Sequence, residues 1–90
     1  MQRYVITLEA SRDLQEIVDY FLKRSIDAGE RFVEEFNQKC ERLLQFPKMG
    51  KLYADISPDL CGILVMNYVL LYKVEEEDIV VVRVVSGHRD

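Results

Sequence analysis

The chain has 90 residues, a net charge of −4 and a sequence pI of about 5.0. This length fits one domain, and so short a chain buries only about 60–65 % of the surface that its unfolded form exposes. The apolar fraction of 49 % is enough for one core, but not for a core and a deep substrate cavity. We therefore expect a shallow working surface, and the acidic total excludes attraction to nucleic acid by the overall field.

The acidic charge is unevenly distributed along the chain. Residues 47–90 contain five Lys or Arg and seven Asp or Glu, and four of the acids are consecutive, from Glu75 to Asp78. Without that run, this half holds five bases and three acids. A local basic patch is therefore compatible with the acidic total.

Two cysteines, Cys40 and Cys61, stand far from any metal-binding pattern, and we expect neither a metal nor a cofactor. Cys40 falls on an apolar helical stripe and is expected in the core. The opening residues show no secretory leader, and no apolar stretch approaches the roughly 18 residues that cross a membrane. These features predict a cytoplasmic protein with no membrane partner.

The first half of the chain predicts a strand followed by two helices. Tyr4–Leu8 is a β-branched and aromatic run typical of a strand. Ser11 is expected to cap the first helix, with Asp13 in its first turn. Asp27 is expected to open the second helix, with Glu30 three residues later as in a capping box. Apolar residues at helical spacing mark the two buried stripes: Leu14, Ile17, Val18, Phe21 and Leu22, then Phe32, Val33, Phe36, Cys40, Leu43 and Leu44.

The second half predicts a small antiparallel sheet. Pro47 ends the second helix, and the loop from Pro47 to Leu60 carries only a weak strand signal. Ile63–Met66, Tyr68–Val74 and Ile79–Ser86 are expected as strands, with Glu75–Asp78 as a solvated hairpin turn. The fold class is therefore α+β, in the order β-α-α-β-β-β. A helical hairpin covers one face of the sheet and leaves the other face free.

Arg83 stands out in the last predicted strand. Strict alternation turns Val80, Val82 and Val84 to one face, which should lie under the helices, and turns Arg83 to the open face. An arginine on an inner strand needs a partner or solvent. Two interpretations stay open, namely a salt bridge across the sheet and a binding or catalytic role.

The order of elements and several short motifs resemble the ParE/RelE toxin superfamily of type II toxin–antitoxin systems, and favour its ParE branch. The resemblance covers essentially the whole chain. The matching motifs are Ala10-x-x-Asp13-Leu14-x-x-Ile17-x-x-Tyr20, Ala28-x-x-x-Phe32, Leu43-x-x-x-Pro47-x-x-Gly50, Asn67-Tyr68-Val69-Leu70-Leu71-Tyr72 and Arg83-Val84-Val85-Ser86-Gly87-His88-Arg89-Asp90.

This resemblance implies a cognate antitoxin as partner, whose C-terminal segment folds onto the toxin. It also implies one of two targets and no small-molecule substrate. ParE-like members poison DNA gyrase by binding it. RelE-like members enter the ribosome and cut messenger RNA without a metal.

The residues that would carry either activity are cationic or able to transfer a proton. RNA cleavage needs a base, a phosphate clamp and an acid, and the candidates are His88, Arg83, Lys51 and Lys48. Target binding without chemistry would use Lys48, Lys51, Arg83 and Arg89. Exposed loop lysines are also common for solubility alone, and an exposed terminal histidine needs no catalytic role.

One departure from the family pattern weighs against nuclease chemistry. Leu60 is followed by Cys61, whereas family members commonly place an arginine there that can clamp a phosphate. We therefore favour a ParE-like gyrase inhibitor over a ribosome-dependent endonuclease. An attenuated toxin, which only binds its antitoxin and helps to repress the operon, is the third alternative.

Overall fold

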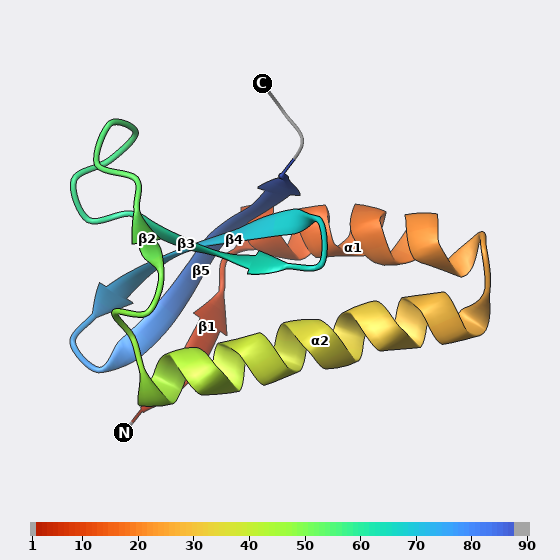
Figure 1. The fold of residues 1–90 in the computed structure, drawn as a ribbon, viewed down its shortest axis with the longest axis horizontal. Coiled ribbons are helices and arrows are strands. Elements are labelled where there is room, and N and C mark those ends of the chain that lie inside the picture. The colour runs from red at the N-terminus through yellow and green to blue at the C-terminus, as the bar shows by residue number, and fades with distance from the viewer. Residues whose placement is uncertain (1, 88–90) are drawn as a thin grey trace.

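The structure is a computed structural model that describes residues 2–87 of the chain (Figure 1). Two helices follow a short first strand, and four further strands complete the chain. The elements are β1 (Tyr4–Ile6), α1 (Leu8–Leu22), α2 (Ile26–Gln45), β2 (Lys51–Leu52), β3 (Cys61–Val65), β4 (Tyr68–Glu75) and β5 (Asp78–Ser86). The predicted order β-α-α-β-β-β is confirmed, with β2 as an additional strand inside the predicted loop.

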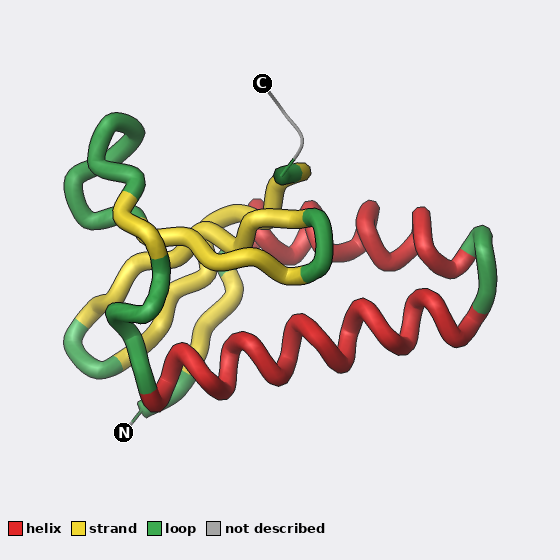
Figure 2. Tube along the Cα trace, viewed as in Figure 1, coloured by secondary structure: helices red, strands yellow, loops and turns green. Residues whose placement is uncertain are grey.

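The strands form one mixed sheet in the order β1-β5-β4-β3-β2. Neighbours among β2 to β5 pair antiparallel, and β1 pairs parallel to β5 at the opposite edge. Figure 2 shows the helical hairpin on one side of this sheet, while the β2–β3 loop projects away from the helices. The sheet therefore keeps one face free of helices.

Both helices begin earlier than the sequence predicted. Thr7, not Ser11, caps α1, because the Thr7 hydroxyl accepts a hydrogen bond from the Ala10 amide at 3.2 Å. Ser25 caps α2 in the same way and accepts from the Ala28 amide at 3.0 Å. A hydroxyl that accepts from the third following amide is the usual helix cap. Asp13 consequently lies inside α1 and does not cap it, so its carboxylate can bind groups of another element.

The core lies between the helical hairpin and one face of the sheet. Phe32 of α2 stacks on Phe21 of α1 and meets the edge of Tyr68 on β4. The fully or nearly fully buried residues are Ala10, Ile17, Phe32, Phe36, Cys40, Leu43, Val65, Leu70, Tyr72, Ile79, Val81 and Val84. Cys40 therefore lies in the core, as predicted.

A register shift in β5 overturns one sequence prediction. Leu71 pairs with Arg83, whereas the next residue, Tyr72, pairs with Val81, so Val82 is an extra residue in β5. Such a bulge reverses the alternation of side chains along the strand. Ile79 and Val81 therefore join Val84 in the core, and the predicted apolar set of Val80, Val82 and Val84 was wrong for its first two members.

Tyr72 joins the core to the turn that follows α2. Its ring is fully buried, and its hydroxyl donates a hydrogen bond to the Pro47 carbonyl at 2.8 Å and accepts one from the Gly50 amide at 3.1 Å. A side chain at Gly50 would collide with this hydroxyl. The Tyr72 phenol therefore fixes the path of residues 47–50.

Replacing Tyr72 by Phe tests this attachment. The variant keeps the ring but leaves the Gly50 amide and the Pro47 carbonyl without their partner, which costs about 1–3 kcal/mol. We expect urea unfolding to show a loss of that size. The matched Tyr53→Phe variant should change stability by less than about 0.5 kcal/mol. Equal losses in the two variants would contradict a specific role for the Tyr72 hydroxyl.

Candidate partner-binding surfaces

The face of the sheet that the helices leave free is mostly apolar. Residues paired across neighbouring strands share a face, so the register places Leu64, Val69 and Val85 in one row across β3, β4 and β5. The next row holds Gly62, Leu71 and Arg83. Leu64 is 62 % exposed. We call this surface the open face.

The β2–β3 loop borders the open face. A side chain at Gly62 would collide with the Tyr53 ring, which shows that this ring packs over Gly62. The Lys51 ammonium lies 5.6 Å from the centre of the same ring, within the range of a cation–π contact. A concavity of about 500 Å³ lies here, lined by Ile56, Leu71, Arg83, Val84, Val85 and Ser86. Its shallow, mainly apolar lining fits a peptide side chain better than a metabolite.

Arg83 is held by a carboxylate from α1. Its Nε and Nη2 donate to the two oxygens of Asp13 at 2.7 and 3.1 Å. The same carboxylate accepts from the Val84 amide at 2.9 Å. The expected salt bridge thus exists, but it reaches the helix and not a neighbouring strand. The Arg83 side chain is still 52 % exposed.

Asp13 and Thr7 together cover an edge of β5 that β1 does not reach. β1 pairs only with residues 79–81. Beyond these, the Thr7 hydroxyl donates to the Val82 carbonyl at 3.1 Å, and Asp13 binds the Val84 amide. Unpaired edge groups invite association with other chains, so these two side chains seal part of this edge.

The electrostatics of Asp13 follow from these contacts. Burial acts to raise its pKa, but the hydrogen bonds from Arg83 and from the Val84 amide outweigh burial and lower the pKa overall. The carboxylate is therefore ionised at neutral pH and offsets the charge of Arg83. Arg83 is presented to a partner as one half of an ion pair.

The other predicted site residues are not all gathered at this face. Lys51 lies beside it, whereas Lys48 lines a separate concavity at the end of α2. His88 and Arg89 lie outside the described residues. Lys73 was missed, although it has the same alternation as Leu71 and Val69 in β4, and it forms a 3.6 Å ion pair with Asp59 of the β2–β3 loop.

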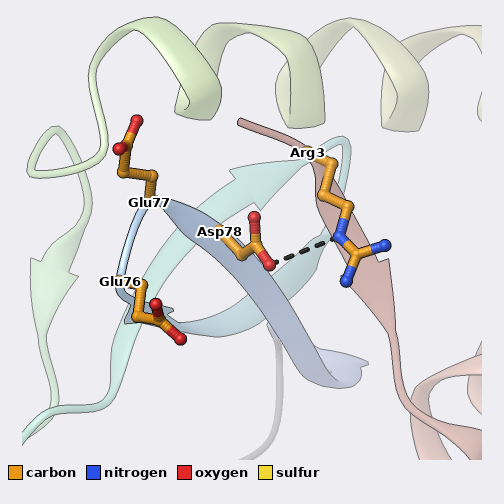
Figure 3. A pocket seen from close by; sticks show the side chains of 4 residues that line it. All are labelled: Arg3, Glu76, Glu77 and Asp78. Carbon is orange, nitrogen blue, oxygen red and sulfur yellow. Dashed lines mark hydrogen bonds and ion pairs between the residues drawn. The ribbon is translucent and has the colours of Figure 1, made fainter. Parts of the chain in front are cut away.

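The acidic hairpin turn is exposed, as predicted. Arg3 binds Asp78 at 3.3 Å, while Glu77 points away from this pair (Figure 3). An exposed pair of this kind contributes little to stability. Four side chains line the shallow concavity here, and three of them are acids. This end of the sheet therefore disfavours anionic partners.

The described residues contain neither a cluster of metal ligands nor a reactive thiol at Cys40. Among residues 2–87, no group of three or more His, Cys, Asp or Glu is placed to hold a metal ion. Burial, together with Glu41, raises the pKa of the Cys40 thiol to about 12, which leaves it unreactive at neutral pH. No helix within residues 2–87 is long and apolar enough to cross a membrane.

Comparison with known proteins identifies the family. Residues 4–90 match the family model described as the ParE toxin of the type II toxin–antitoxin system parDE. The chain belongs to the ParE toxin family. Toxin ParE3 of Caulobacter vibrioides is 26 % identical to this ParE-family chain over 88 residues, which cover 97 % of the chain and 88 % of that protein.

A solved structure shares the fold. The chain is similar to a structure of the chromosomal ParDE TA system from P. aeruginosa, with a TM-score of 0.75 and coverage of 96 % of both chains. The sequence identity is 18 %, so this likeness supports the fold alone. The expected resemblance to ParE toxins is confirmed, and this ParE-family chain is one component of a toxin–antitoxin system.

Cys61, the residue at which the sequence departs from the expected family pattern, does not lie on the open face. It pairs across the sheet with the buried Tyr72 and packs against the core. A longer cationic side chain at this position would start from the helix side of the sheet. The missing arginine therefore leaves the charge of the open face itself unchanged.

Replacing Asp13 by Ala tests the tie between α1 and β5. Near pH 7 we expect the free energy of unfolding to fall by about 1–3 kcal/mol, because the Val84 amide loses its acceptor. The folded-state pKa of Asp13 is lowered, so its carboxylate stabilises the fold above the unfolded pKa of about 3.9 and less as the pH falls through the folded value.

The difference between wild type and Asp13→Ala should therefore narrow as the pH falls below about 4. Urea unfolding between about pH 3 and pH 7 measures this difference. Asp19→Ala, on the same helix, serves as the control for loss of an exposed acid. A pH-independent difference would contradict the assignment to the ionised carboxylate.

Proposed function

We propose that this ParE-family toxin inhibits DNA gyrase by binding it and is neutralised by a cognate antitoxin. The observation that carries the proposal is the ion pair of Arg83 with Asp13, at 2.7 Å. A phosphate clamp for RNA cleavage needs cations whose charge is available, and Asp13 already offsets the charge of Arg83. This arrangement suits recognition of a protein better than cleavage of RNA.

We assign the apolar rows of the open face to the antitoxin, and Arg83 at their border to the target. These rows form an apolar surface beside the Ile56 side chain and consist of Leu64, Val69, Leu71 and Val85. A disordered antitoxin segment that folds on binding lays alternate apolar side chains into such a surface. The same proposal places the protein in the cytoplasm, where gyrase acts.

A ribosome-dependent endonuclease is the second candidate, and one observation favours it. Lys51 and Arg83 both border the open face, where Lys73 is a third cation. Together with His88 and Lys48 they would supply the clamp and the proton transfer that RNA cleavage needs. Its weakness is that Asp13 and Asp59 already pair with two of these cations.

Purified protein distinguishes these functions. We expect loss of gyrase supercoiling activity with translation unaffected, and recovery of supercoiling when the cognate antitoxin is added. Message cleavage that appears only with ribosomes would replace gyrase by the ribosome as target. Tight antitoxin binding with neither effect would identify an attenuated toxin that acts only as co-repressor.

Arg83→Ala tests the role of the open face in cells. We expect this variant to lose growth inhibition while keeping its fold, because Asp13 still binds the Val84 amide when the guanidinium is gone. Growth after induction gives the first readout, and urea unfolding of the purified variant gives the second. Arg24→Ala, which removes an exposed arginine whose guanidinium binds the Tyr20 hydroxyl and lies over its ring, is the matched control. Undiminished toxicity of Arg83→Ala would remove Arg83 from the target surface.

A further inference from the structure

A second surface lies where α2 ends, at the end of the helix nearest to β2 (Figure 1). It is a concavity of about 690 Å³ lined by Arg42, Gln45, Phe46, Pro47, Lys48 and Met49. We call it the α2-exit groove. It is formed by the last turn of α2 and the turn that Tyr72 fixes, and it shares no lining residue with the concavity of the open face.

The floor of the α2-exit groove is apolar although it faces solvent. Phe46 is 56 % exposed and Met49 is 44 % exposed. Scattered apolar residues on a surface are ordinary, but large ones gathered in a hollow mark sites for other molecules. A bulky apolar side chain of a partner would bury both of them.

Two cations border this floor. Within residues 2–87, neither Arg42 nor Lys48 has an ion-pair or hydrogen-bonded side-chain partner. Of the described cations, Arg3, Lys73 and Arg83 are paired with carboxylates, and Arg42 and Lys48 are among those that are not. In a chain of net charge −4, two unpaired cations beside an apolar hollow are complementary to acidic groups on a partner.

The α2-exit groove is also held in shape before any partner arrives. The Phe46 amide donates to the Arg42 carbonyl at 2.8 Å, and the Met49 amide donates to the Phe46 carbonyl at 3.1 Å. Tyr72 fastens Pro47 and Gly50 from the core. A surface that is already ordered loses little entropy on binding.

We propose that the α2-exit groove is a contact for gyrase, and that it takes an acidic segment that carries a large apolar side chain. This inference rests on the proposed function and adds the surface and the chemistry of the recognised segment. A stable protein–protein interface buries about 1,600 Å² in total, and this groove can form only a part of such an interface. It therefore acts as an anchoring point inside a larger contact.

Two variants test the two halves of this recognition. Arg42→Gln with Lys48→Gln removes the unpaired cations, and Phe46→Ser removes the apolar floor while changing an exposed side chain. We expect each to weaken gyrase inhibition in a supercoiling assay by about tenfold or more. Affinity for the purified cognate antitoxin, measured by calorimetry, should change by less than about twofold.

The matched control is Lys23→Gln with Arg31→Gln, which gives the same net charge near the other end of α2. It should inhibit gyrase as wild type does, and circular dichroism and urea unfolding should show all variants folded.

If wild type inhibits gyrase and both groove variants do so equally well, the groove assignment is overturned and the proposed function stands. If wild type does not inhibit gyrase, both are overturned. A loss of antitoxin affinity equal to the loss of inhibition would make the groove an antitoxin site and overturn the assignment to gyrase.

Discussion

The Tyr72 hydroxyl joins the three parts of this molecule. Its ring lies in the core between sheet and helices, and its hydroxyl binds Pro47 and Gly50 in the turn that connects α2 to the sheet. Burial of a phenol is favourable only when its polar atom finds partners, and here the partners are backbone groups of an exposed turn. The course of the turn after α2 and the shape of the α2-exit groove thus depend on one side chain of the core.

Packing on one face has a functional consequence. The helical hairpin satisfies the apolar residues of one side of the sheet, so Leu64 and its neighbours on the open face have no covering layer within the chain. An apolar face can give a partner its binding energy, which is the role proposed above for the antitoxin. The acidic surface charge keeps this exposed face from promoting nonspecific contact with nucleic acid.

Much of the fold could be predicted from the sequence, because its strongest signals are periodic. The stripes of α1 and α2 and the runs of β3 to β5 specify their elements through local spacing. The predicted cap residues were wrong because a helix cap lies where the chain leaves the preceding element. For Thr7 and Ser25, the apolar spacing of the helix does not indicate that point. The bulge at Val82 was missed because it arises from pairing with β4, and its reversal of the alternation could not be read from β5 alone.

The candidate site was predicted less well. Arg83 lies on the open face as expected and Lys51 borders that face, whereas Lys48 belongs to another surface. The contact of Asp13 with Arg83 was not predicted, because Asp13 was assigned to the start of a helix.

The two surfaces differ in whether their cationic side chains are paired with carboxylates. This difference suits them to different kinds of partner. On the open face, Asp13 and Asp59 pair with Arg83 and Lys73, and Lys51 at its border lies over the Tyr53 ring, so an incoming chain meets mainly apolar groups. In the α2-exit groove, Arg42 and Lys48 have no such partners within residues 2–87 and flank Phe46. Neutralised apolar surfaces favour extensive contacts of low charge specificity, whereas free cations beside an apolar hollow discriminate through charge. The proposed antitoxin and the proposed target would therefore meet chemically distinct surfaces of one small chain, although a single core supports both.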